Sequence, residues 1–162
     1  MTYDELLKSF GEKLGGGLVF EPDEAGAVTL SVDGMPVTIL GLEEVGQVVL
    51  TGVVGETPPE DRMERLYKAL LQANHNFAAT AGATMSVDPA DDRISLCKAL
   101  PLALADAESF FAEVERFVNT LETWRKIVSD FCGQEIEPGG DPEASAMAGE
   151  PDFPRADGFM QV

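Results

Sequence analysis

Residues 67–102 read YKALLQANHNFAATAGATMSVDPADDRISLCKALPL, and this stretch decides the fold. It opens with apolar side chains at helical spacing, which predicts the end of an amphipathic helix. Small residues follow, and then two β-prone segments, 83–87 and 94–100, flank the acidic turn at 88–92. The stretch therefore predicts a helix that leads into a pair of strands, and it holds no obvious catalytic residue.

The chain before this stretch predicts a first helix over residues 2–14. Thr2 and Glu5 have the spacing of a capping box, in which each side chain bonds to the other residue's backbone. The glycines at 15–17 are expected to end the helix, because glycine is favoured just past a helix end.

Four short strands are expected next, at residues 18–21, 27–32, 35–40 and 47–54. Asp33-Gly34 predicts a hairpin turn, because both residues tolerate positive φ. Connections this short do not allow parallel crossovers, so the strands should form an antiparallel meander.

Two further helices complete the pattern. One is expected over residues 60–77, and its apolar side chains cover a wide arc, which suggests burial against both the core and a partner subunit. The other starts after Asp106 and carries a regular apolar stripe to Phe131. The predicted class is α+β, ordered α-β-β-β(-β)-α-β-β-α, with helices packed on a twisted antiparallel sheet.

Composition indicates one domain with an acidic tail. The chain has 162 residues, 44% of them hydrophobic, and a formal net charge of −18. Nucleic acid and anionic membranes are poor partners, because an acidic surface repels both. Residues 1–132 are expected to form the domain, and the Gly- and Pro-rich residues 133–162 a disordered tail.

The same sequence predicts a reduced, cytoplasmic protein. Cys97 and Cys132 make no disulfide framework, and the first residues lack the basic and apolar regions of a signal peptide. No run of about 18 apolar residues is present, so no membrane span is expected.

Candidate catalytic and metal sites are weak. His75 has no nucleophile at a recognisable spacing, and Asp88, Asp91 and Asp92 lack the glycine and glutamate of a calcium loop. Gly15–Gly17 precedes an expected strand rather than a helix, unlike a phosphate-binding loop. We expect no enzyme activity, no cofactor and no metal.

The ordered set of motifs resembles the class I type III secretion chaperones, the Tir-chaperone (CesT-like) family. The resemblance rests on LLQAN at 70–74, GATMSVD at 82–88, ISL at 94–96, LPL at 100–102 and the helix that holds Trp124-Arg125. It implies a homodimer in the bacterial cytoplasm that binds the N-terminal segment of a secreted effector in extended form, without ATP. It also makes the secretion ATPase a candidate further partner.

Site residues follow from the resemblance by element and apolar pattern. The implied effector-binding residues come from the first helix and the sheet: Leu6, Leu7, Phe10, Leu14, Val19, Phe20, Val28 and Leu30. The implied dimer contacts come from the second helix and the following strand: Met63, Leu66, Leu70, Ala83, Met85 and Val87.

Two alternatives stay open on sequence alone. One is a non-catalytic regulatory or protein-binding module on the same scaffold, similar to YbjN. The other is a small hydrolase that uses Glu or Asp, which would need a pocket with close carboxylates.

Overall fold

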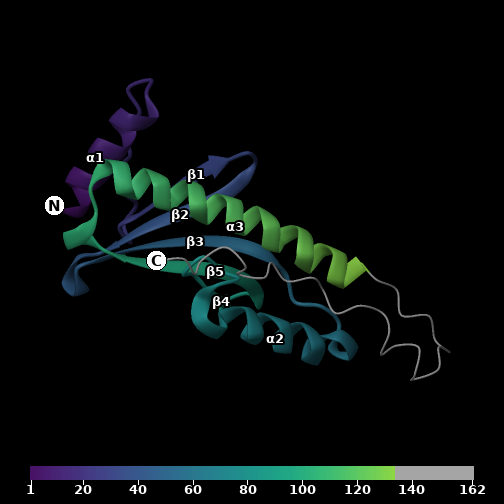
Figure 1. Ribbon diagram of the computed structural model, residues 1–162. Helices are drawn as coiled ribbons and strands as arrows, with labels where there is room; N and C mark the ends of the chain where they lie inside the picture. Colours follow the sequence, from purple (N-terminus) through teal and green to yellow (C-terminus); the bar gives the residue numbers. More distant parts are fainter. Residues whose placement is uncertain (134–162) are drawn as a thin grey trace, which may run out of the picture.

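The computed structural model describes residues 1–133, and the expected tail lies outside the described residues except for Gly133. Figure 1 shows a sheet crossed by one long helix, with a shorter helix at each end. The elements are α1 (Tyr3–Leu14), β1 (Ala27–Val32), β2 (Met35–Leu42), β3 (Gln47–Glu56), α2 (Glu60–Asn74), β4 (Thr84–Val87), β5 (Arg93–Pro101) and α3 (Ala107–Gly133). This is the α+β order predicted from the sequence.

The five strands form one antiparallel sheet in the order β1-β2-β3-β5-β4. The β1–β2 hairpin turns at Asp33 and Gly34, whose φ angles of 50° and 77° are the left-handed values that such a tight turn requires. β1 and β4 are the two edge strands. The expected meander is confirmed for β1, β2 and β3.

The strand expected at residues 18–21 is wrong. Leu18 to Glu21 have no strand assignment and pair with none of the strands in residues 1–133. The segment packs against α1 instead, where Phe20 stacks on Phe10 with ring centroids 5.8 Å apart. Its β-prone side chains therefore serve a helix contact rather than a strand pair.

Helix α3 lies close to the middle of the sheet because β3 offers glycines where the two meet. A methyl group on Gly52 would lie 2.5 Å from Cδ2 of Leu121, and one on Gly55 would lie 3.0 Å from Cγ1 of Val128. The indole nitrogen of Trp124 donates a hydrogen bond of 2.9 Å to the carbonyl oxygen of Ala79. These contacts fix the height and the direction of α3 over the sheet.

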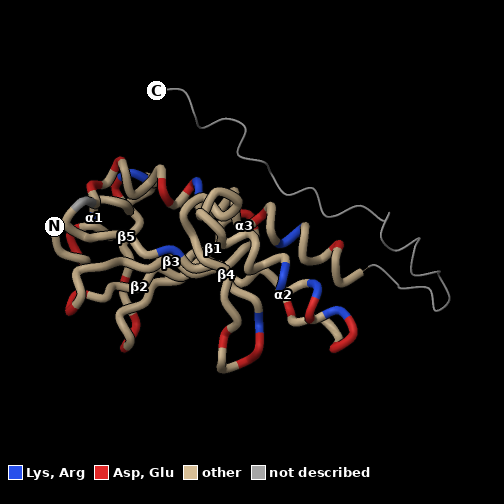
Figure 2. Tube along the Cα trace, turned by 60° about the horizontal axis from the view of Figure 1, so that its bottom comes forward, with Lys and Arg blue, Asp and Glu red and all other residues tan. Residues whose placement is uncertain are grey.

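A partly buried ion pair also joins the sheet to α3. The Lys98 side chain is 9% exposed, and its Nζ lies 2.6 Å from Oε2 of Glu113 and 2.7 Å from the carbonyl oxygen of Ala81. Burial favours the neutral acid, but the hydrogen bonds and charges of Lys98 and Arg116 together outweigh it and lower the pKa of Glu113. Figure 2 shows how few basic residues the described chain has beside its many acidic ones.

Helix α2 ends at Asn74 rather than at residue 77. The Asn74 side chain accepts a 2.8 Å hydrogen bond from the Met85 backbone N–H and donates one of 3.2 Å to the Met85 carbonyl. Asn76 and Phe77 then have φ angles of 58° and 57°, which an α-helix does not allow. Asn74 thus ties the end of α2 to the edge strand β4.

The beginning of α1 is capped as predicted. The Thr2 side chain accepts from the Glu5 N–H at 3.2 Å, and the Glu5 carboxylate accepts from the Thr2 N–H at 2.8 Å. In the first turn, Tyr3 is 4% exposed and its hydroxyl donates to the Ile39 carbonyl at 2.8 Å. This residue joins α1 to β2.

The buried Tyr3 makes stability sensitive to alkaline pH. Burial disfavours the phenolate and raises the pKa of Tyr3 from 10.0 to about 12. The unfolded chain loses this proton first, so the stabilisation is complete below pH 10.0 and is lost as the pH rises to about 12. We expect urea denaturation to show that Tyr3→Phe loses less stability over this range than wild type. A Tyr67→Phe control should behave as wild type does, and an identical pH profile for Tyr3→Phe would contradict this role.

Candidate functional site

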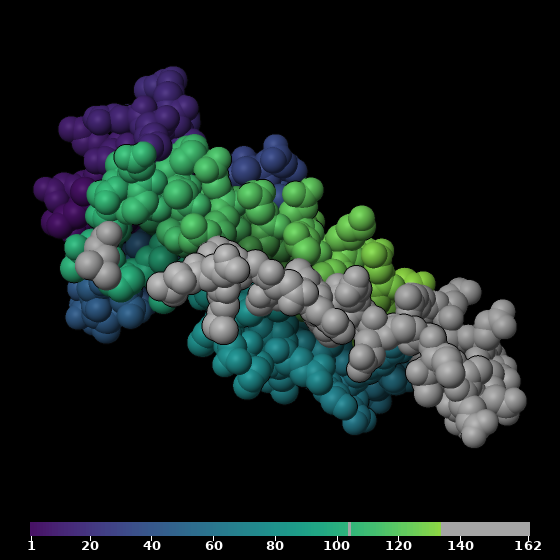
Figure 3. All heavy atoms as spheres, in the orientation of Figure 1, coloured from purple at the N-terminus to yellow at the C-terminus, as the bar shows by residue number. Residues whose placement is uncertain are grey.

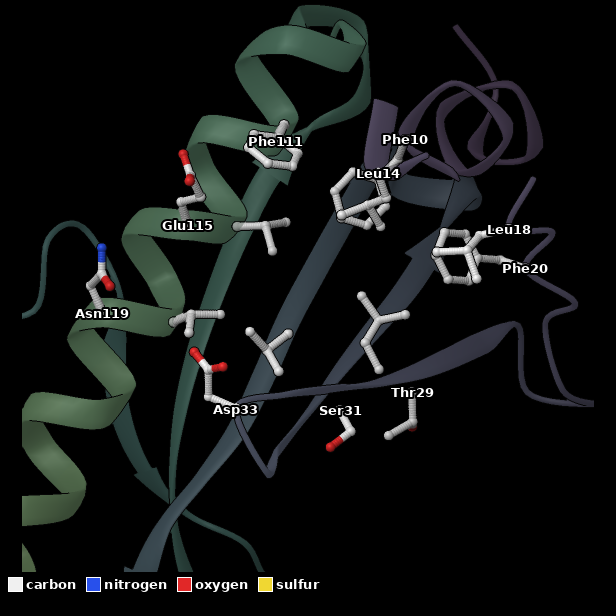
Figure 4. Close-up of a pocket in the computed structure, with 14 residues that line it drawn as sticks. Phe10, Leu14, Leu18, Phe20, Thr29, Ser31, Asp33, Phe111, Glu115 and Asn119 are labelled. Atoms are coloured by element: carbon white, nitrogen blue, oxygen red, sulfur yellow. The ribbon is translucent and has the colours of Figure 1, made fainter. Parts of the chain in front are cut away.

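An apolar groove of about 740 Å³ lies between α1, α3 and the edge strand β1. Phe10 and Leu14 come from α1, and Leu18 and Phe20 come from the connection that follows it. Residues 29–33 form the β1 side, and the wall opposite is α3 with Phe111, Val114, Glu115, Val118 and Asn119. Figure 4 shows these side chains around the groove.

Aromatic rings build one end of the groove. Phe10 packs edge to face on Phe110 with centroids 5.2 Å apart, and the ring of Phe111 lies 6.2 Å from Phe10. The Lys13 ammonium stands 5.4 Å from the centroid of Phe111. Ring stacking and this cation hold the aromatic wall in place without filling the groove.

The segment Leu18–Phe20 divides this groove from a second hollow of about 430 Å³ on the other side of α1. Leu18 and Phe20 line both, and Val19 lines the second hollow, where it is 81% exposed. The segment approaches α1 at Gly11, where a methyl group would overlap the carbonyl oxygen of Leu18. Gly11 is therefore needed for the close contact that puts Leu18 and Phe20 between the hollows.

The structure divides the predicted effector-binding residues into two sets. Leu6, Leu7, Phe10 and Val28 are at most 6% exposed, so they fill the core of the protomer. Leu14 and Val19 are exposed, and Phe20 and Leu30 are half-buried. Of these four, Leu14, Phe20 and Leu30 line the groove together with Phe10.

Sequence reasoning missed the contribution of α3 to this groove. Phe111, Val114 and Val118 belong to the apolar stripe of the long helix, which was predicted as a helix face without any binding role. The length of the stripe could have indicated this contribution. The earlier turns of α3 lie beyond the part of the helix that Gly52 and Gly55 bring against the sheet. Leu18, 51% exposed, was placed in a strand and was also missed.

The predicted dimer residues are mostly internal to the protomer. Leu66, Leu70, Ala83 and Met85 are at most 6% exposed, while Met63 is half-buried and Val87 is 39% exposed. Leu71 and Phe77 lie at the same end of the sheet and are 70% and 52% exposed. This end of the molecule therefore shows apolar side chains, but largely different ones from those predicted.

The described part of the chain holds no group of three or more His, Cys, Asp or Glu placed to bind a metal ion. Within residues 1–133, no helix is both long and apolar enough to cross a membrane. Space-filling atoms show α3 as a ridge between the α1 end and the α2 end of the molecule (Figure 3).

Comparison with known proteins identifies the family. The sequence profile of the Tir chaperone protein (CesT) family matches residues 5–125. The chain belongs to this family. The match runs from α1 well into α3, so it includes all the elements that line the groove. A search of curated protein sequences found no significant match.

Solved structures share the CesT-family fold at low sequence identity. A chain of the ExsC–ExsE complex is 21% identical with a TM-score of 0.65, covering 78% of this chain and 96% of that one. The Yersinia pestis type III secretion chaperone SycH, solved with a stable fragment of YscM2, is 22% identical with a TM-score of 0.59, covering 76% and 99%. YbjN, a putative transcription regulator from E. coli, is 17% identical with a TM-score of 0.56, covering 75% and 87%.

Gly11 provides a test of the contact between α1 and the connection after it. Alanine is about 1 kcal/mol better than glycine inside a helix, so Gly11→Ala would ordinarily stabilise the protein. Here the added methyl group must displace the Leu18 backbone, and we expect a loss of about 1–3 kcal/mol in the free energy of unfolding. Urea denaturation measures it, with Ser9→Ala on the same helix as a control near zero. A more stable Gly11→Ala protein would show that the contact does not form.

Proposed function

We propose that this protein is an ATP-independent cytoplasmic chaperone that holds the N-terminal segment of a type III secreted effector in extended form. The observation that carries the proposal is the apolar groove that opens beside β1, an edge strand of the sheet within residues 1–133, in a CesT-family chain. An extended client can add a strand to such an edge and place alternate side chains in the groove. Burial of these side chains supplies the binding energy, so holding the client needs no nucleotide.

The magnitudes favour a client that contacts more than one groove. Fully burying one large apolar side chain is worth about 1.5–3 kcal/mol, so two anchors supply about 3–6 kcal/mol. Micromolar affinity needs about 8 kcal/mol after the cost of ordering the client has been met. A longer client segment that wraps over two protomers meets this requirement, and a homodimer supplies the second groove.

We place the homodimer contact at the end of the molecule formed by α2 and β4. Leu71, Phe77 and Val87 gather apolar surface there, and β4 is an edge strand. The groove lies by the opposite edge, at β1, so a contact through α2 and β4 leaves both grooves open.

The likeness to YbjN supports a regulatory binding module as the second candidate, because the two chains share the fold. The two functions differ in what they bind. A chaperone requires the groove for an unfolded N-terminal segment, whereas a regulatory module would bind a folded partner or act without such a segment.

Groove variants test client binding. Leu14→Asp combined with Leu18→Asp changes two exposed groove residues, 42% and 51% exposed, with little disturbance of the core. We expect at least about tenfold weaker binding of an effector's N-terminal segment, since a carboxylate replaces an apolar contact at each site. The measurement is calorimetry with the segment that co-purifies with the wild-type protein. Val45→Asp, 66% exposed and outside the groove, should bind as wild type does. Equal affinities for all three proteins would place the client elsewhere.

A charge on the exposed face of α2 tests the dimer. Leu66 and Leu70 are unsuitable, because a charge at either buried position would disturb the core of the protomer. Leu71→Asp should raise the dimer dissociation constant by at least about a hundredfold, because burying an unpaired carboxylate at an interface costs about 3 kcal/mol or more. Sedimentation velocity reads this directly, and Val45→Asp should still sediment as a dimer. An unchanged dimer in Leu71→Asp would rule out this placement.

A further inference from the structure

The two sides of the groove differ in chemistry. The side near α1 is formed by the rings and aliphatic groups of Phe10, Leu14 and Phe20. Asp33 lies at the β1–β2 turn, and Figure 4 shows Glu115 and Asn119 on the α3 wall, with Glu115 next to Phe111. Asp33 and Glu115 are the charged residues of the lining, which contains no Lys or Arg in the described chain.

Neither carboxylate is neutralised by a cation within the described residues. The ion pairs of residues 1–133 join Arg62 to Asp61, Arg93 to Asp91, and both Lys98 and Arg116 to Glu113. Arg116 follows Glu115 in the chain, yet its guanidinium pairs with Glu113. Lys13 lies by Phe111, at the aromatic end. The groove lining therefore carries two carboxylates, one at the β1–β2 turn and one on α3, that form no ion pair within residues 1–133.

We propose that the groove selects extended segments whose apolar residues are flanked by Lys or Arg, with the cation placed against Asp33 and Glu115. This inference rests on the proposed function, since it names the chemistry of the client that the same groove holds. Exposed ion pairs add little affinity each, but they fix register and discriminate against segments of the wrong charge. The net charge of −18 attracts such a segment from a distance as well.

Other occupants fit this charge pattern less well. Residues 134–162 carry Asp or Glu at 135, 137, 141, 143, 150, 152 and 157, against a lone arginine at 155. Placing them in the groove would bring like charges together. A second copy of the chain would bring its own acidic surface to the same side.

Three labelled peptides that differ only in their flanks test the proposal on the full chain. They are KKVTVLVTKK, EEVTVLVTEE and QQVTVLVTQQ, with both ends changed so that the result does not depend on the direction of binding. Fluorescence anisotropy gives the dissociation constants at low and high salt. The key variant is Asp33→Asn with Glu115→Gln, because asparagine tolerates the positive φ of residue 33 and keeps the turn. Glu44→Gln with Glu64→Gln removes the same charge from exposed positions outside the groove.

We expect wild type and the control variant to bind the lysine peptide about tenfold more tightly than the glutamate peptide, with the glutamine peptide between them. In Asp33→Asn with Glu115→Gln this ratio should fall to about two or less, and in wild type it should shrink at about 0.5 M salt. An unchanged ratio in the key variant would overturn the proposal and leave the chaperone function intact.

The remaining outcomes separate this proposal from the proposed function. If wild type binds all three peptides equally, and Leu14→Asp with Leu18→Asp weakens that binding, the groove binds the client but does not select it by charge. Binding that ignores both sets of variants would overturn the groove itself, and with it both proposals. If a second copy of the chain occupies the groove, it competes with the peptides. The apparent affinity for all three peptides would then fall equally as the protein concentration rises. If residues after Gly133 occupy the groove, Phe153→Ser with Phe159→Ser should lower the dissociation constants of all three peptides equally. No preference for the lysine peptide would then be seen.

Discussion

The close approach of α3 to β3 is the constraint on which the rest of the structure depends. Gly52 and Gly55 remove the side chains that would otherwise separate the helix from the sheet, so Leu121 and Val128 lie directly on the strand backbone. Trp124 and the Lys98–Glu113 pair then fix the helix along its length and about its axis. The contacts hold α3 from Glu113 near its beginning to Val128 near its end, and Phe111, Val114 and Val118 of its earlier turns form one wall of the groove.

The groove keeps apolar surface open in a protein that must avoid aggregation. Exposed apolar patches promote aggregation, and high net charge opposes it by repulsion between copies. The −18 formal charge therefore has two consequences for this chain. It protects the groove from other copies of the same protein, and it favours partners whose charge is opposite.

Helix α1 shows how one short element can serve two purposes. Its inner face puts Leu6, Leu7 and Phe10 into the core, while Leu14 at its end is 42% exposed and lines the groove. The fold alone does not distinguish a chaperone from a regulator, since SycH and YbjN both resemble this chain at TM-scores of 0.59 and 0.56. The family assignment instead depends on the sequence profile over residues 5–125.

The sequence by itself determined the features that depend on neighbouring residues. The capping box at Thr2 and Glu5, the Asp33-Gly34 hairpin and the start of α3 after Asp106 all form as predicted, because a few adjacent dihedral angles and hydrogen bonds decide them. The groove lining was predicted only in part: Phe10, Leu14, Phe20 and Leu30 were among the predicted binding residues, whereas Phe111, Val114 and Val118 were given no binding role. Only the tertiary structure decided that residues 18–21 pack on Gly11 instead of joining the sheet, and that Leu66 and Leu70 are internal while Leu71 faces outward. An apolar side chain in a sequence shows that it favours burial, but what covers it depends on segments far away in the chain, and these meet only in the folded protein.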